Sequence, residues 1–229
     1  EKLRDGLIHM IAHDMKSPLM VIMGSLEMVK MQLEKTKEGT DSLIKYIYGA
    51  SNSAIKITNM ISNMLDISKI EAKQMTLQLY KISLKQIVSQ TIQMFDFIKG
   101  ERILTFEQSD EIPNFISDPN IIQRICQNLI DNAIKFTDQK SGKINVCIKK
   151  VSDDRVKVSI SDNGHGIPLE YHEKIFDKFF QVESKKQIKV HSTGLGMAFC
   201  KLATEAIGGT IGVESEVEKG STFWFELPF

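Results

Sequence analysis

Residues 128–135 read NLIDNAIK, and together with two glycine-containing stretches further along the chain they decide the fold. Those stretches are DNGHG at residues 162–166 and GLG at residues 194–196. Asn128 and Asn132 are four residues apart, so a helix places both amides on one face. Glycines that open a helix leave free N–H groups, which suit a phosphate group. Amides on a helix, an acid beside two glycines and a second glycine pair therefore predict a site for a purine nucleoside triphosphate and a divalent cation.

The composition of the chain is that of an ordinary globular protein. It has 229 residues, 42% of them hydrophobic, which is enough for one large domain or two small ones. The formal net charge is zero, so nothing in the charge favours a nucleic acid or an anionic membrane as partner. The three cysteines are an odd number without CxxC spacing, which argues against a disulfide framework or a zinc site. A reducing compartment fits them best, and we expect this chain to be cytoplasmic.

The chain shows neither a membrane span nor a signal peptide. Its longest apolar runs are far shorter than the ~20 residues that a bilayer requires. It begins at Glu1 rather than at Met, which suggests a fragment of a longer protein. We expect any membrane anchor or sensor region to lie upstream of residue 1.

The first third of the chain has the pattern of a helical hairpin. Apolar residues from Leu43 to Met64 are spaced 4,3,4,3,4,3, which is a heptad seam. A first helix begins near Leu3 with the same spacing, and the polar stretch 34–41 is the predicted turn. Such a hairpin has more apolar surface than it can bury alone, and two hairpins can bury it by forming an antiparallel four-helix bundle. We therefore expect residues 1–72 to form a homodimer; packing of one hairpin on the rest of the chain is the alternative.

The remaining residues, 73–229, alternate between helical and strand patterns, which predicts an α/β sandwich. The helix with the clearest start covers residues 118–136, because Asp118 can cap it and Pro119 suits its first position. The other predicted helices cover residues 84–98, 168–177 and 194–206. The predicted strands cover residues 75–80, 102–107, 113–117, 143–150, 156–161, 210–215 and 222–227, and the polar stretch 182–193 is expected to be a mobile loop.

Residues 13–18, which read HDMKSP, place a histidine on the first helix with an acid beside it. An imidazole nitrogen is unprotonated often enough at neutral pH to attack phosphorus. Asp14 can take the proton from the other ring nitrogen, and Pro18 should bend the helix at this turn. A lone helical histidine would more often have no role, but beside a nucleotide site His13 becomes a candidate phosphoacceptor. His9 lies one turn earlier, but no third ligand has the spacing that a metal would need.

Five stretches in one order and spacing resemble the catalytic core of a sensor histidine kinase of a two-component system. They are HDMKSPL at 13–19, NLIDNAIK at 128–135, DNGHG at 162–166, FDKFF at 176–180 and GLG at 194–196. The resemblance covers nearly the whole chain. It implies a dimerisation and histidine-phosphotransfer domain over residues 1–72. It also implies an ATP-binding domain of the Bergerat fold (GHKL type), shared with gyrase, Hsp90 and MutL, over residues 73–229.

The same resemblance implies an activity, cofactors and partners. ATP and Mg²⁺ would be the cofactors, and His13 would be autophosphorylated. The phosphoryl group would pass to an aspartate in the receiver domain of a response regulator, with dephosphorylation of that regulator as a further activity. Two alternatives remain: a degenerate kinase that acts as a nucleotide-binding scaffold, and a GHKL-type ATPase.

The resemblance assigns a role to each residue of the nucleotide site. Asn132 is the expected Mg²⁺ ligand, because a hard cation prefers amide, phosphate and water oxygens. Asn128 stands where related ATPases have a water-activating glutamate, so an amide here should suppress hydrolysis. Lys135 should lie near the phosphates, and Asp162 should accept a hydrogen bond from the adenine amino group. The expected catalytic residues are His13, Asp14 and Ser17. The expected nucleotide-binding residues are Asn128, Asn132, Lys135, Asp162, Gly164, Gly166, Ile167, Phe180, Thr193, Gly194, Leu195 and Gly196.

Several positions depart from the family pattern. Ser17 stands where these kinases often carry Thr or Asn, and Gln181 stands where many have an Arg that neutralises the γ-phosphate. Ser192 replaces a frequent Gly, and Ile121 and Arg124 replace a common Arg and Gln pair. Each nucleotide-site stretch also has a plainer explanation when taken alone: an exposed polar helix face, a tight Asp-Asn-Gly turn or a glycine hinge.

Overall fold

The computed structural model describes residues 18–29, 31, 40–96, 98–109, 111–182 and 194–229. The chain divides into two compact units, Glu1–Leu65 and Asp66–Phe229. The division falls inside the long helix α2 (Thr40–Glu71), whose last six residues belong to the second unit.

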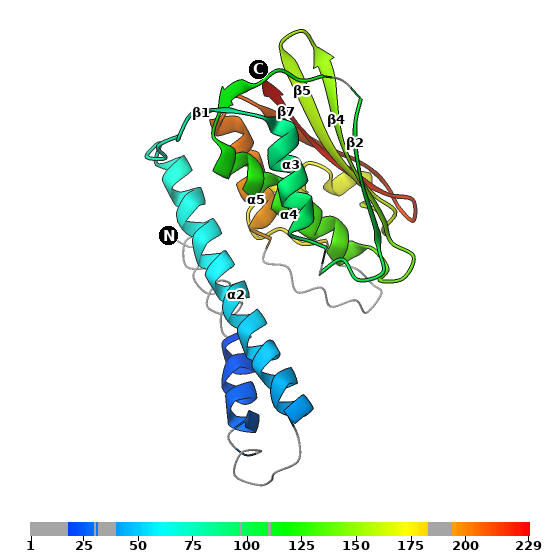
Figure 1. The fold of residues 1–229 in the computed structure, drawn as a ribbon. Coiled ribbons are helices and arrows are strands. Elements are labelled where there is room, and N and C mark those ends of the chain that lie inside the picture. Colours follow the sequence, from blue (N-terminus) through cyan, green and yellow to red (C-terminus); the bar gives the residue numbers. More distant parts are fainter. Residues whose placement is uncertain (1–17, 30, 32–39, 97, 110, 183–193) are drawn as a thin grey trace. The chain divides into compact units, whose positions relative to one another are not determined.

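The described part of the first unit is helical, as the sequence predicts (Figure 1). Residues 18–29 and 31 form a helix, and the part of α2 up to Leu65 forms the other. The two helices come close where Gly49 faces Ser25, since a Cβ on Gly49 would lie 3.4 Å from the Ser25 hydroxyl. Large apolar side chains on both helices are exposed, among them Met20, Met23, Leu26, Ile47 and Leu65. None of the helices that the structure describes is long and apolar enough to cross a bilayer.

The second unit contains a five-stranded mixed sheet in the order β2-β4-β5-β7-β6. Its strands are β2 (Ile103–Gln108), β4 (Lys143–Ser152), β5 (Arg155–Asp162), β7 (Gly220–Pro228) and β6 (Thr210–Glu216). Only the β2–β4 pair is parallel among these described strands. A separate antiparallel pair consists of β1 (Tyr80–Ile82) and β3 (Phe115–Ser117).

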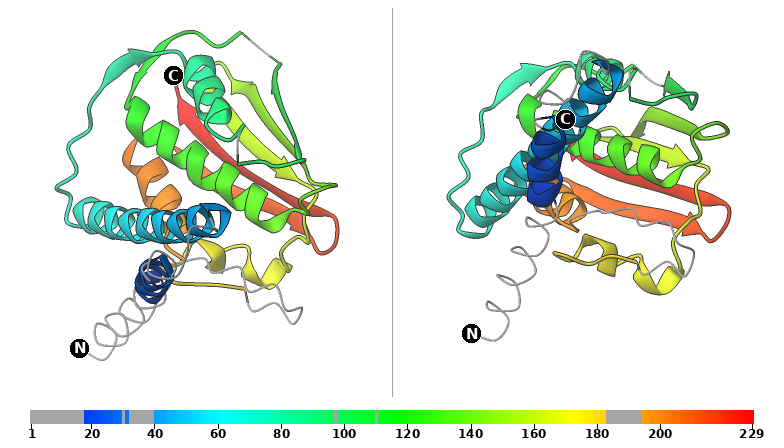
Figure 2. Two further views of the ribbon diagram at one scale, coloured as in Figure 1. Left: turned by 60° about the horizontal axis from the view of Figure 1, so that its bottom comes forward. Right: turned by 90° about the horizontal axis from the view of Figure 1, so that it is seen from below.

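Three helices cover one face of the five-stranded sheet, as Figures 1 and 2 show. They are α3 (Leu84–Gln93), α4 (Pro119–Phe136) and α5 (Gly196–Ala206). Two short 3₁₀ helices, η1 (Leu169–Tyr171) and η2 (Lys174–Phe176), precede α5. The core forms because every second residue of each inner strand points at the helices. Buried examples are Val156, Val158 and Ile160 of β5, which meet Ile125 and Leu129 of α4 in one apolar cluster.

Four predicted elements differ from the structure by more than a small shift of a strand end. Residues 75–79 form no strand: Met75 and Leu77 pack against the core, which produces the alternation, but only the short β1 that follows pairs with β3. The helix predicted over 84–98 ends at Gln93, because the next amides bond three residues back instead of four, starting with Met94 N to Thr91 O at 3.2 Å. The helix predicted over 168–177 is the pair of 3₁₀ turns, and α5 begins at Gly196.

Candidate nucleotide-binding site

Helix α4 carries the asparagine stretch, and its start is fixed by Asp118. The Asp118 Oδ1 atom accepts hydrogen bonds from the N–H groups of Asn120 at 2.9 Å and Ile121 at 3.2 Å. The other carboxylate oxygen accepts from Gln78 N at 2.7 Å, so the segment before β1 is tied to the same cap. One side of α4 is buried in the core, and this orientation leaves Asn128 and Asn132 half-buried on the rest of the helix surface.

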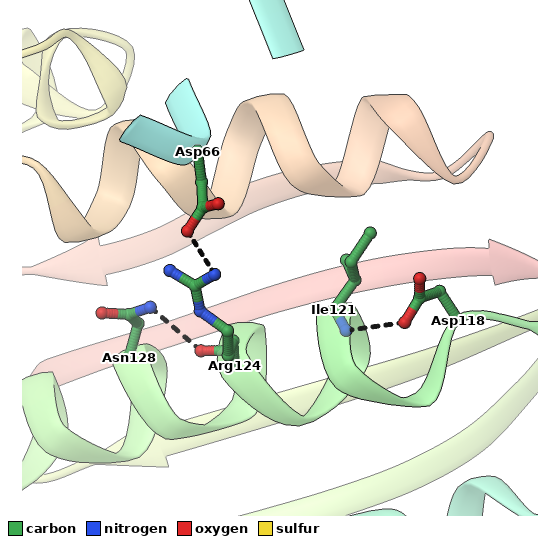
Figure 3. Close-up of polar contacts among 5 residues, drawn as sticks. All are labelled: Asp66, Asp118, Ile121, Arg124 and Asn128. Carbon is green, nitrogen blue, oxygen red and sulfur yellow. Dashed lines mark hydrogen bonds and ion pairs between the residues drawn. The ribbon is translucent and has the colours of Figure 1, made fainter. Parts of the chain in front are cut away.

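Asn128 links the asparagine stretch to the second glycine pair. Its side-chain nitrogen donates to the Arg124 carbonyl at 2.9 Å (Figure 3). Its Oδ1 atom faces the first residue of α5, because a Cβ built on Gly196 would lie 3.0 Å from that oxygen. Two stretches that are more than sixty residues apart in sequence are therefore neighbours in space, as the sequence predicts for one site.

Asn132 and Lys135 lie further along α4, toward its C-terminal end. Within the described residues the Asn132 side chain makes no hydrogen bond, so its amide oxygen is available to a ligand. Lys135 forms an ion pair with Asp131, one turn back on the same helix. A phosphate near Lys135 would therefore compete with this carboxylate for the ammonium group.

A magnesium ion fits the donors that α4 offers. Mg²⁺ usually keeps several waters and takes one or two protein oxygens together with phosphate oxygens. The Asn132 amide supplies one such oxygen, and its lack of a hydrogen bond among the described residues leaves that oxygen free. In the part of the chain that the structure describes, no group of three or more His, Cys, Asp or Glu side chains could hold a metal by itself.

Asp162 ends strand β5 in a partly buried position between β4 and β7. Its Oδ1 atom accepts a hydrogen bond from Gly164 N at 2.8 Å. Burial raises the pKa of the Asp162 carboxyl, and backbone hydrogen bonds from Gly164 and Ser221 with the nearby His165 partly oppose that rise. The Asp162 carboxylate is thus partly desolvated, and it can accept a further hydrogen bond from a ligand.

The glycines after Asp162 permit two close backbone approaches. A Cβ on Gly164 would lie 2.5 Å from the Phe136 carbonyl oxygen at the end of α4, so only glycine lets this loop reach the helix. Gly166 has a φ of +70° and its Cβ would meet the Glu216 carbonyl at 2.0 Å. The next residue is also held, because Ile167 N donates to the Ser215 hydroxyl at 2.8 Å.

The FDKFF stretch (residues 176–180) also contacts the second glycine pair. Phe179 N donates to the Gly194 carbonyl at 3.0 Å, and Phe179 itself has a φ of +65°, which is strained for an aromatic residue. Phe180 packs against Tyr171 with ring centroids 5.5 Å apart, and Leu195 is buried in the core. Four of the five motifs therefore converge in the second unit: the asparagine stretch, the two glycine pairs and the FDKFF stretch.

Some predicted site residues lie outside the described residues. They are His13, Asp14 and Ser17 of the proposed phosphoacceptor turn, and Thr193 of the proposed nucleotide site. Their roles stay predictions, as do the nucleotide contacts of the described residues.

Sequence reasoning missed two contacts of α2 with the nucleotide-binding fold. Asp66 forms an ion pair with Arg124, and Glu71 forms one with Lys178. The departure of Arg124 from the family pattern was the one available signal, but no local rule names its partner.

Comparison with known proteins finds a different family model for each part of the chain. Residues 3–73 match the family model described as His Kinase A (phospho-acceptor) domain. Residues 117–229 match the one described as Histidine kinase-, DNA gyrase B-, and HSP90-like ATPase. The chain belongs to the histidine kinases. The predicted fold class, a helical region followed by an α/β sandwich of the GHKL type, is thereby confirmed.

This histidine kinase core is similar to parts of longer curated proteins. It is 30% identical over 221 residues to the sensor histidine kinase RcsC of Escherichia coli (strain K12), covering 95% of this chain and 22% of RcsC. It is 29% identical over 231 residues to the adaptive-response sensory kinase SasA of a Synechocystis species, covering 98% of this chain and 59% of SasA. The chain thus spans about a fifth of one relative and about three fifths of the other.

Solved histidine kinases share the fold. Acinetobacter baumannii histidine kinase AdeS matches with a TM-score of 0.70 at 20% identity, over 94% of this chain and 97% of that one. Histidine kinase ThkA, solved in complex with response regulator protein TrrA, matches with a TM-score of 0.65 at 28% identity, over 97% of this chain and 61% of that one.

Proposed function

We propose that this histidine kinase core transfers the γ-phosphoryl group of ATP to His13 and then to an aspartate of a response regulator. The observation that carries the proposal is the convergence of four motifs in the second unit. Asn128 Oδ1 faces Gly196, Gly164 abuts the end of α4, and Phe179 bonds to Gly194. Residues 1–72 would be the phosphotransfer domain and 73–229 the ATP-binding domain.

Recognition of ATP would use the carboxylate at the end of β5 and the start of α5. The Asp162 carboxylate would accept the adenine amino group, whereas a guanine carbonyl would be repelled. The start of α5 offers free backbone N–H groups to the phosphates, since it has no side-chain cap. A protein of the same fold supports an adenine nucleotide as the ligand: full-length ShkA has been solved in complex with AMPPNP.

Asn132 would hold Mg²⁺ together with the phosphate oxygens. The ion would supply neutralisation of phosphate charge, which is the main chemical requirement of phosphoryl transfer. Lys135 would add a second positive charge after exchanging Asp131 for a phosphate oxygen. The protein's own part is to orient the triphosphate and exclude competing nucleophiles.

Asn128 argues against a simple ATPase. A water-activating base must take a proton, and a neutral amide cannot do so. The Asn128 side-chain nitrogen is already engaged with the Arg124 carbonyl, which fixes its orientation and points the oxygen toward Gly196. Without a base at this position the γ-phosphate would persist until His13 attacks it, with Asp14 as the general base.

The partners follow from the family and from the exposed helices. ThkA has been solved with a response regulator, which supports a receiver domain as the second acceptor for this chain. Exposed apolar residues such as Ile47 and Leu65 support a homodimer built from paired hairpins. A monomer mass in sedimentation equilibrium would contradict the dimer. Dephosphorylation of the regulator would involve Ser17. The three cysteines form no disulfide, which fits a reducing, cytoplasmic compartment for this chain.

Incubation with γ-labelled ATP and Mg²⁺ tests the proposed reaction directly. We expect label in the wild type that survives base and is lost in acid, as a phosphoramidate should behave, and no label in His13→Ala. His9→Ala is the matched control, one helical turn away, and should keep the label.

Other outcomes of the same assay would identify the alternatives. Base-labile label would contradict phosphorylation of a histidine. Multiple-turnover release of phosphate without a covalent adduct would identify an ATPase. Thermal stabilisation by ATP with no label at all would identify a nucleotide-binding scaffold.

A further inference from the structure

The last six residues of α2 are packed into the second unit. The boundary between the compact units follows Leu65, yet α2 continues without a break to Glu71. Ile67 is only 4% exposed and belongs to the main apolar core of the second unit. The end of the helix is thus part of the nucleotide-binding fold, although most of the helix is not.

An ion pair fixes this helix end to the helix that bears the asparagine stretch. Asp66 Oδ2 lies 2.5 Å from Arg124 Nη1. Figure 3 shows the two side chains pointing toward each other. The Arg124 guanidinium also lies over the Phe199 ring of α5, with its carbon 4.3 Å from the ring centroid. Arg124 is one turn before Asn128, so the pair joins α2 to both helices that carry nucleotide-site residues.

A second ion pair ties the final residue of α2 to the FDKFF stretch. Glu71 pairs with Lys178, and the next residue, Phe179, bonds to Gly194. Both pairs are partly exposed, with side-chain exposures of 30% and 19% for Arg124 and Asp66. Partly exposed pairs are weak enough to break and re-form, unlike the buried apolar core around them.

We propose that the Asp66–Arg124 pair is a releasable clasp, and that its opening limits how often the second unit delivers ATP to His13. This inference rests on the proposed function, because delivery requires the second unit to turn relative to the first. Residues 60–71 contain neither Gly nor Pro, so α2 has no built-in hinge near the clasp. Residues 72–74 instead offer slack of at most roughly 11 Å once the helix end is free, because Met75 and Leu77 pack on the core and Gln78 is bonded to Asp118.

The test compares the variants Asp66→Asn and Arg124→Gln with the charge swap Asp66→Arg/Arg124→Asp. Asp96→Asn is the matched control, since it removes an exposed ion pair with Lys99 elsewhere in the second unit. The hydrogen-exchange rate of the backbone amides of residues 67–71 measures how often the end of α2 opens. This measurement does not depend on kinase activity. Initial rates of His13 labelling and the affinity for ADP are measured on the same proteins.

We expect both single variants to speed exchange at residues 67–71 by on the order of two- to fivefold, the effect of losing a partly exposed pair. Initial labelling should rise by a similar factor at unchanged ADP affinity, and the swap should return both towards wild type. The control should change neither.

Unchanged exchange rates in the single variants would show that the Asp66–Arg124 pair does not hold the end of α2, and would overturn the inference. Faster exchange with equal or slower labelling would also overturn it, because the pair would then support delivery instead of restraining it. A wild type that takes no label would overturn the proposed function, while the exchange data would still decide whether the clasp exists.

Discussion

Asp162 combines a partly buried carboxylate with the proposed recognition of adenine. Because burial raises its pKa, the folded protein holds the Asp162 proton more tightly than the unfolded chain does. Between the ordinary and the raised pKa the folded state therefore binds more protons, and stability falls as pH rises through that window. Once Asp162 is ionised, its burial destabilises the fold, and a bound adenine amino group would offset that cost.

The substitution Asp162→Asn separates the two effects. The nucleotide-free variant should be at least as stable as wild type at pH 7, because no charge is buried, and the fall in stability above the ordinary Asp pKa should be smaller. ADP binding should weaken by about ten- to a hundredfold, the loss of a hydrogen bond to a charged group. Thermal unfolding across pH and calorimetric titration with ADP measure both. A less stable variant that still binds ADP normally would contradict the assignment.

Single residues were predictable from the sequence only where a local rule applied. The spacing of Asn128 and Asn132 requires one helical face, and the structure places them on α4 as expected. Asp66 and Arg124 are 58 residues apart, and their contact depends on how α2 packs against α4. Neither periodicity nor a motif contains that information, which is why Arg124 could be recognised as unusual but not explained.

At the scale of elements, α4 shows why some boundaries follow from sequence and others do not. Asp118 and Pro119 specify the start of α4 by themselves, and the structure has the helix begin there. Residues 75–79 alternate like a strand, yet their apolar side chains face the core without a ladder partner. A strand requires a neighbour as well as a pattern, and the neighbour is set by tertiary packing.

We expect the Asp118 cap to stabilise both α4 and the segment that precedes β1. Asp118→Ala removes the acceptor of Asn120 N and Ile121 N and also that of Gln78 N, so two elements lose contacts at once. We expect a loss of about 2 kcal/mol in the free energy of unfolding, at the upper end for a cap. Asp118→Asn keeps one oxygen acceptor and should lose less. Urea unfolding gives both values, and equal stability of Asp118→Ala and wild type would show that the cap is dispensable.

At the scale of the whole molecule, the two units differ in what stabilises them. The second unit has an apolar core of its own between the sheet and three helices, and the residues proposed for its nucleotide site come from several separate stretches of sequence. The described part of the first unit exposes large apolar side chains, which fits a unit completed by a second copy. Nucleotide binding should therefore be a property of the second unit alone, and phosphoryl transfer a property of both.

Two fragments of the second unit measure what the end of α2 contributes. The fragment 66–229 keeps Ile67 and both ion pairs of the helix end, whereas the fragment 73–229, which starts at the predicted domain boundary, loses them. Burial of one isoleucine stabilises a fold by about 1.5–3 kcal/mol. Part of this gain is lost to fraying, because six helical residues do not hold together alone. We therefore expect the longer fragment to be more stable by about 2 kcal/mol, or roughly 4–8 °C in Tm for a domain of this size. Ile67→Ala in the longer fragment is the matched control and should remove most of the difference. Because the expected nucleotide-binding residues in the described chain all follow Asp118, both fragments should bind ADP with the same affinity.

Equal stability of the two fragments would show that the second unit does not hold the end of α2. The Asp66–Arg124 pair would then have no helix end to release.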